Sequence, residues 1–348
     1  MNKRVFYRLL IVMVLLPLAL AAADYPECYM CGKKITRRYL TDRNKRMYCS
    51  RGCFDKSLPR CANCRQVCRG RFLVNKDKYF CSKKCADEML LPRCHRCGKG
   101  FTYGRKLQVA YGEFVYCQEC SALPGCLVCE RPEKSMRQYS NGHYLCIQCN
   151  KNVISNKADL ERHFRKVRAF LVQHLRFRND HVIKLKMRHF ELGKKDQNDN
   201  VSREFGLYSY SGKEIYTKPL AIEFWRKKQT TVRYENESCT IEIMNDLPAF
   251  KAEEVIAHEL AHDYMKHRWY YIKDLTLREG FAELVSAEYN RLTGNGRWNY
   301  RMQNNPDPVY GNGYRLLKSY FDKGSWAEVE RQLDAANYRA MPDELKQK

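Results

Sequence analysis

The chain has 348 residues, with 63 Lys and Arg against 39 Asp and Glu, and a formal net charge of +24. This length suggests two or three domains and is enough to bury a hydrophobic core. So basic a balance would favour nucleic acid as a partner in a cytosolic protein. Two features argue against that partner here. The N-terminus predicts export, and sixteen zinc-bound thiolates would reduce the net charge of residues 24–150 from +14 to about +6.

The first 23 residues are expected to be a secretory signal peptide that is cleaved before Asp24. Basic residues at positions 3, 4 and 8 precede an apolar run over residues 9–20, and three alanines follow it. The run is too short to span a bilayer comfortably, so an uncleaved anchor is the weaker alternative. No second segment is apolar enough to cross a membrane. The mature protein is therefore expected to be periplasmic or secreted, without an integral membrane segment.

Residues 24–150 predict an array of four small zinc-finger modules. They hold seventeen of the eighteen cysteines, and the modules begin at residues 28, 61, 94 and 126, a period of 32 to 33 residues. In each module two cysteine pairs lie sixteen to nineteen residues apart, which suits a tetrahedral zinc site with four cysteine ligands. Modules this small bury little apolar surface, so bound metal would supply much of their folding free energy. The predicted ligands are Cys28, Cys31, Cys49 and Cys53; Cys61, Cys64, Cys81 and Cys85; Cys94, Cys97, Cys117 and Cys120; and Cys126, Cys129, Cys146 and Cys149.

Export leaves a disulfide framework open as the alternative for these cysteines. The fourfold repetition of one paired spacing favours zinc. Cys68 and Cys239 are left over; each is interpreted as a buried thiol, with a disulfide between them as the less favoured alternative. The modules resemble LIM domains, although the intervals between them are longer than in a LIM pair. LIM domains are adaptors, so the resemblance implies docking of a partner or substrate.

Residues 151–180 are predicted to form a linking helix, because apolar side chains recur at spacings of three and four from Leu160 to Leu175. A catalytic domain of α+β type is expected over residues 181–348, beginning with a mixed sheet. Its candidate strands are residues 182–190, 220–225, 230–234 and 240–244. Strand 240–244 is considered both as a substrate-pairing edge strand and as an ordinary half-buried strand.

Two predicted helices carry the candidate chemistry. The first runs from Pro248 to about Lys266, with Asn245 or Asp246 as its N-cap, and contains His-Glu-x-x-His. Its histidines, His258 and His262, are four apart and share one face, so they can bind one zinc ion. Glu259 lies at the edge of that face and can reach a metal-bound water. Asp263 and His267 are interpreted as solvent-facing or packing residues.

The second helix is predicted over residues 275–292 and contains Glu279-Gly280-Phe281-Ala282-Glu283. A carboxylate from such a neighbouring helix would complete a set of three protein ligands, which leaves a zinc ion one open position for water. The aromatic residues at 269–271 have two possible roles, which are to line a cleft or to pack in the core. Further packing helices are expected after Arg315.

A His-Glu-x-x-His helix followed by Glu-Gly-Phe-Ala resembles the gluzincin metallopeptidases. The resemblance implies that Glu279 is the third zinc ligand and that Glu283 orients a zinc histidine. It also implies that Tyr310, in Tyr310-Gly311-Asn312-Gly313, steadies the oxyanion. Together with the LIM-like modules, the chain resembles the LIM-domain peptidases that restrain organ growth in plants and their bacterial relatives. The interval from His262 to Glu279 is slightly shorter than in aminopeptidases.

The sequence therefore predicts a zinc-dependent peptidase in which Glu259 is the general base. Its cofactors would be one catalytic zinc ion and up to four structural ones, and its fingers would dock a partner or a peptide or protein substrate. The alternative is a non-catalytic adaptor that keeps a degenerate peptidase fold.

Overall fold

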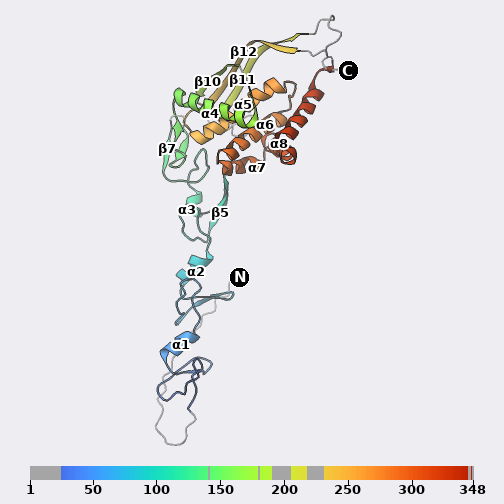
Figure 1. The fold of residues 1–348 in the computed structure, drawn as a ribbon. Coiled ribbons are helices and arrows are strands. Elements are labelled where there is room, and N and C mark those ends of the chain that lie inside the picture. The colour runs from blue at the N-terminus through green and yellow to red at the C-terminus, as the bar shows by residue number, and fades with distance from the viewer. Residues whose placement is uncertain are drawn as a thin grey trace. The chain divides into compact units, whose positions relative to one another are not determined.

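The fold is described from a computed structural model that covers residues 25–139, 142–178, 181–189, 205–217, 231–343 and 346. The expected signal peptide and the candidate strand 220–225 lie outside these residues. The protein is a mixed α+β chain in which four N-terminal clusters of four cysteines precede helices and small sheets (Figure 1). This coarse architecture confirms the prediction from the sequence.

The chain divides into two compact units. One extends to Arg105 and includes Val115–Glu119, and the other comprises Lys106–Phe114 and Cys120–Lys348. Within the described residues, no helix is both long and apolar enough to cross a membrane.

Each of the first three modules combines an antiparallel strand pair with a short helix, and the fourth has a strand pair. The helices begin at the second cysteine pair, where Ser50 and Ser82 accept hydrogen bonds from the N–H groups of Cys53 and Cys85. This N-cap explains why the last ligand of these modules sits in the first turn of a helix. The elements are β1 (Leu40–Thr41), β2 (Met47–Tyr48), α1 (Arg51–Ser57), β3 (Leu73–Asn75), β4 (Lys78–Phe80), α2 (Lys83–Leu90), β5 (Gly104–Val109), β6 (Gly112–Cys117), α3 (Gln118–Ser121), β7 (Met136–Gln138) and β8 (Tyr144–Cys146).

The modules also share one buried position. The residue just before the third cysteine is fully buried in all four modules. In chain order it is Tyr48, Phe80, Tyr116 and Leu145. Cys68 lies seven residues after Cys61, as Ile35 lies seven after Cys28, and both are buried in their module cores. Burial raises the pKa of Cys68 to about 11, so it is a neutral packing thiol there.

The second unit contains a mixed three-stranded sheet in the order β10 (Ile183–Arg188), β12 (Thr231–Met244) and β11 (Gly206–Thr217). β12 pairs in parallel with β10 and antiparallel with β11. The predicted strands 230–234 and 240–244 are thus parts of one strand. Because residues 240–244 are hydrogen-bonded on both sides, their interpretation as a substrate-pairing edge was wrong, and among the described strands β10 and β11 lie at the edges of the sheet.

Helices cover this sheet, with α4 against β10 and α5 against β11 and β12 (Figure 1). α4 confirms that residues 151–180 contain a helix, although it packs within the core of the second unit, and α6 has the predicted bounds. The predicted N-cap of α5 was wrong. Leu247–Pro248 form a strand, β13, that pairs with β9 (Val153–Ile154), so Pro248 is the N-cap and has no side-chain hydrogen bond. The helices are α4 (Lys157–Leu175), α5 (Ala249–Arg268), α6 (Leu275–Leu292), η1 (Gly296–Asn299), α7 (Tyr300–Gln303) and α8 (Tyr310–Ala340), with a kink at Gly324–Ser325.

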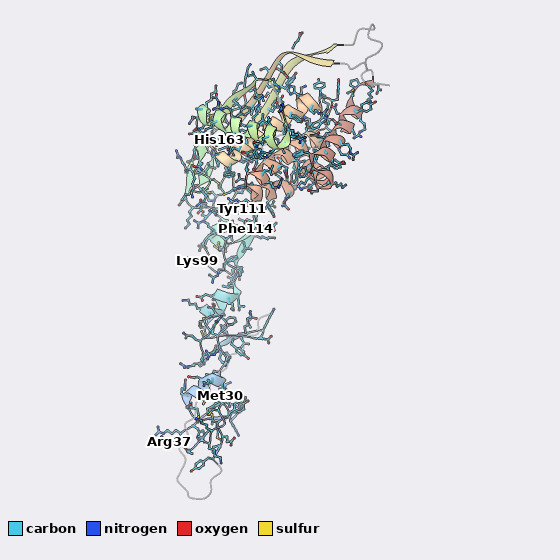
Figure 2. The ribbon with its side chains drawn as sticks, viewed as in Figure 1. Met30, Arg37, Lys99, Tyr111, Phe114 and His163 are labelled. Carbon is cyan, nitrogen blue, oxygen red and sulfur yellow. The ribbon has the colours of Figure 1, made fainter. Side chains whose placement is uncertain are left out.

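The core of the second unit also includes the fourth cysteine module. Cys126, Cys129, Cys146 and Cys149 are all buried in one cluster with the apolar faces of α4, α5, α6 and α8. Tyr111, which lies between β5 and β6 and is labelled in Figure 2, also joins this core and packs edge-on against Trp298 with ring centroids 5.4 Å apart. The fourth module is therefore stabilised by this core as well as by its cysteines.

Candidate metal centres

The sixteen predicted finger cysteines form four separate tetrads, and within each tetrad all sulfur atoms lie within 4.8 Å of one another. The sulfur pairs Cys31–Cys49, Cys49–Cys53 and Cys81–Cys85 are 3.7, 3.6 and 3.5 Å apart. A disulfide would need about 2.05 Å, whereas the edges of a tetrahedron with Zn–S bonds of about 2.3 Å are about 3.8 Å long. All eighteen cysteines, which lie in the described part of the chain, are free. The tetrads therefore fit metal ions, and thiolate donors favour zinc.

The backbone prepares the first cysteine of each of the first three tetrads to act as a thiolate. Burial opposes ionisation of Cys28, but N–H groups of Cys49, Cys31 and Met30 point at its sulfur and lower its pKa to about 6. Cys61 and Cys94 are arranged in the same way, also with a pKa of about 6. A second thiolate beside the first is unfavourable without a cation, and contact with Cys53 and Cys31 raises the pKa of Cys49 to about 12. A bound divalent cation would remove this conflict.

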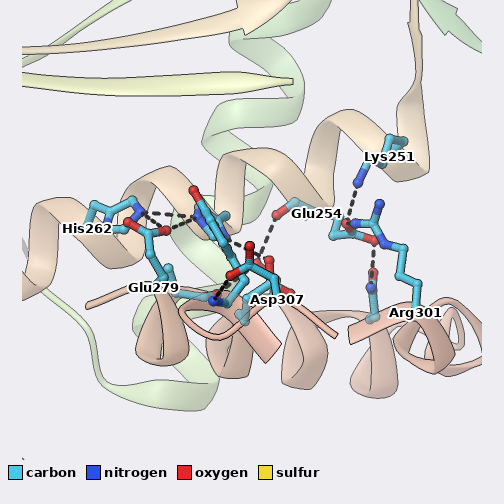
Figure 3. A network of polar contacts seen from close by, with 12 residues as sticks. Lys251, Glu254, His262, Glu279, Arg301 and Asp307 are labelled. Carbon is cyan, nitrogen blue, oxygen red and sulfur yellow. Dashed lines mark hydrogen bonds and ion pairs between the residues drawn. The ribbon is translucent and has the colours of Figure 1, made fainter. Parts of the chain in front are cut away.

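The predicted catalytic ligands converge between α5 and α6. His258 Nε2 and His262 Nε2 are 3.1 Å apart, and each lies 3.3 Å from Glu279 Oε2. Figure 3 shows His262 and Glu279 reaching toward each other from the two helices. Ligand atoms on a tetrahedral zinc with bonds of about 2.0 to 2.2 Å are about 3.3 to 3.5 Å apart. The three side chains thus have the separations of one shared metal ion.

The electrostatics of this group also suit a cation. Burial lowers the pKa of His258, but Glu279, Glu259 and Glu283 outweigh it and raise that pKa to about 9. Burial opposes ionisation of Glu279, yet the two histidines hold its pKa well below the usual range. The field that favours an imidazolium here would equally favour a divalent metal ion.

The predicted general base, Glu259, is buried beside the start of β11. A Cβ added to Gly206 would lie 2.6 Å from Glu259 Oε1 and 2.5 Å from Val255 Cγ1. A side chain at this position would have to displace the Glu259 carboxylate and the Val255 side chain. The edge strand β11 therefore begins in contact with the residue predicted to perform the proton transfer.

Glu283 lies one turn beyond Glu279 on α6, and its Oε1 is 3.7 Å from His258 Nδ1. Burial raises the pKa of Glu283. It thus faces the nitrogen of His258 that points away from Glu279, the place of a group that orients a metal-binding histidine.

Tyr310 is 39% exposed and is the first residue of α8. Its N–H donates to Asp307 Oδ1 over 2.9 Å. One turn on, Gly313 touches Gly280, since a Cβ added to Gly280 would lie 2.3 Å from the carbonyl carbon of Gly313. This crossing places the first turn of α8 beside the turn of α6 that carries Glu279.

Buried charges anchor α5 upstream of the histidines (Figure 3). Glu254 contacts Arg301 and accepts from Lys251 Nζ at 2.7 Å and from Asn290 Nδ2 at 2.9 Å. Burial alone would raise the pKa of Glu254, but Arg301 and Lys251 lower it to about 2. Because breaking a buried charge pair is costly, this network fixes α5 against α6 and α7.

A second ionic contact joins α5 to α4. Glu253 Oε1 lies 2.6 Å from both His163 Nδ1 and Lys166 Nζ on α4, and Tyr289 on α6 donates to Glu253 Oε2 over 2.8 Å. One buried carboxylate thus joins three helices.

A further candidate metal group was not predicted from the sequence. His181, Cys239, Asp263 and His267 bring ligand atoms within 4.8 Å of one another, and His181 Nε2 is 2.8 Å from Asp263 Oδ1. The interpretation of Asp263 as solvent-facing was wrong, because it is fully buried, and His267 is only partly exposed. They are four apart on α5, the same spacing as the predicted zinc histidines, and that was the available signal. His181 and Cys239 join them only through tertiary packing.

No protein-family model, no curated protein and no solved structure matches the chain.

Proposed function

We propose that the protein is a zinc-dependent peptidase of gluzincin type. The observation that carries the proposal is the convergence of His258 Nε2, His262 Nε2 and Glu279 Oε2 at separations of 3.1 to 3.3 Å. Two histidines and a carboxylate are a ligand set of hydrolytic zinc sites, which keep an open position for water. Zinc bound there would polarise a substrate carbonyl and lower the pKa of water to about 7.

Three further residues would take part in the reaction. Glu259 would take the proton of the attacking water and later deliver it to the leaving amine nitrogen. Glu259 is buried and its carboxylate lies close to Gly206, which limits its freedom and favours proton transfer over a short distance. Glu283 would hold His258 in one orientation. Tyr310 would donate to the oxyanion, a contribution of about 3 to 4 kcal/mol where one such donor has been removed.

In this proposal the fingers dock a peptide or protein substrate or a protein partner, and the mature protein acts outside the cytoplasm. The regular array of four modules, each with a cysteine tetrad that fits a metal ion, supports a docking role. The predicted leader supports export.

The test compares wild-type protein with Glu259→Gln and His258→Ala in hydrolysis of a randomised octapeptide library, read by mass spectrometry. Wild type should cleave, and both variants should lose cleavage. Glu259→Gln should keep all its zinc, because Glu259 is not one of the three converging ligands. This variant therefore separates loss of the general base from loss of the metal ion. If zinc-loaded wild type cleaves nothing, the proposal fails and an adaptor with a degenerate peptidase fold takes its place.

A further inference from the structure

A cavity of about 270 Å³ opens between β11, the C-terminal half of α5 and the start of α6. Its lining includes three cationic side chains and no carboxylate. The lining residues are Tyr208, Tyr210, Met265, Lys266, Trp269, Tyr270, Ile272, Lys273 and Arg278.

The cavity lining and the proposed metal ligands are carried by the same two helices. Met265 and Lys266 lie one turn beyond His262 on α5, and Arg278 directly precedes Glu279 on α6. A peptide with its scissile bond at the three ligands could therefore place a neighbouring side chain in the cavity.

Aromatic rings hold the two ammonium groups in place. Lys266 Nζ lies 4.0 Å from the ring centroid of Tyr270 and 4.3 Å from that of Tyr210. Lys273 Nζ lies 4.2 Å from the Tyr270 centroid and donates to the Tyr270 carbonyl over 3.2 Å. In the described part of the chain, no ion pair joins Lys273 or Arg278 to a carboxylate within 4.0 Å. The ammonium groups are thus positioned before a ligand arrives, which lowers the entropy cost of binding an anion.

We propose that this cavity is a specificity pocket for a peptide carboxylate, supplied by an Asp or Glu side chain or by the C-terminus of the substrate. The proposal rests on the peptidase function and names the substrate class of that site. Lys266, Lys273 and Arg278 supply the positive charge. A lysine or arginine of the substrate would meet like charges and is excluded.

A charge-assisted hydrogen bond contributes about 1.5 to 3 kcal/mol. We therefore expect kcat/KM for peptides with Glu at the recognised position to be about tenfold to a hundredfold higher than for otherwise identical Gln peptides. The preference should weaken with added salt, because Lys273 is exposed and ions screen it.

The experiment measures the ratio of kcat/KM for Glu and Gln octapeptides that are otherwise identical, chosen from those that wild type cleaves. Each pair is made with a free and with an amidated C-terminus, which separates a side-chain carboxylate from a terminal one. The same pairs are tested for binding to Glu259→Gln by fluorescence anisotropy, and this second readout needs no hydrolysis. If wild type cleaves none, the binding pairs are alanine-rich octapeptides with one Glu or Gln at each position in turn.

The test variant is Lys273→Glu, at an exposed position where folding should be retained, and Lys266→Gln is the second variant. Lys157→Glu is the matched control, because Lys157 is an exposed lysine on α4 that does not line the cavity. The Glu-to-Gln ratio should fall below about threefold in Lys273→Glu and stay at its wild-type value in Lys157→Glu.

Equal rates for Glu and Gln peptides at every position, with cleavage intact, would overturn the pocket and leave the peptidase standing. Selective binding of acidic peptides without any cleavage would support the pocket and refute the peptidase. Neither cleavage nor selective binding would overturn both.

Discussion

The contact between Gly280 and Gly313 predicts that Gly280→Ala destabilises the protein, whereas helix propensity alone would predict the opposite. In an open helix, Gly→Ala stabilises by about 1 kcal/mol through helix propensity. Here the added Cβ would lie 2.3, 2.5 and 2.6 Å from the carbonyl carbon, the oxygen and the Cα of Gly313. All three are backbone atoms and cannot rotate away, so α6 and α8 must separate by about 1 Å to reach ordinary contact distances.

Overpacking of this kind costs about 1 to 3 kcal/mol, and a backbone contact belongs at the upper end. After the propensity gain, Gly280→Ala should be destabilised by about 2 kcal/mol. Glu279 is the preceding residue, so the shift should also move its carboxylate relative to the histidines. A misplacement of about 1 Å can reduce activity about a hundredfold.

The assay is urea unfolding followed by tryptophan fluorescence. All four tryptophans lie at or beyond residue 225, so the signal reports the second unit. Zinc affinity is measured in parallel by competition with a chelator. Gly296→Ala is the matched control, because its Cβ would meet Arg291 Cα at an ordinary 3.6 Å. A gain in stability for Gly280→Ala, or unchanged zinc affinity and activity, would refute the close crossing of α6 and α8.

Three further predictions concern metal content and pH. His258→Ala should lose one zinc ion per chain while the finger tetrads keep theirs, measured by elemental analysis; unchanged zinc would contradict the shared site. Cys239→Ser should also lose one zinc ion, and unchanged content would mean that the His181 group is only a hydrogen-bonded network. Burial lowers the pKa of Lys251 from 10.5 to about 8, so the unfolded chain binds more protons between these values. The free energy of unfolding should therefore rise by up to about 3 kcal/mol from pH 8 to 10.5, and unfolding titrations of Lys251→Met should lack most of that rise.

Features set by local spacing were predictable from the sequence alone. The four cysteine tetrads follow from a repeat of 32 to 33 residues, since each pair of ligands belongs to one tight turn or to the start of one helix. The bounds of α6 follow from its periodicity and from Asp274, whose carboxylate accepts from two N–H groups of the first turn. The common face of His258 and His262 follows from the geometry of one helix.

Contacts between distant segments were decided only by the tertiary structure. The sequence placed Glu279 on a second helix, but its distance to the histidines depends on the crossing of α5 and α6. The central position of β12 depends on pairing with two strands from elsewhere in the chain. The group of His181, Cys239, Asp263 and His267 draws on three separate segments. Helical hydrogen bonds, capping contacts and side-chain periodicity act over a few residues of sequence. These arrangements depend instead on how the whole core packs, and no local pattern encodes that packing.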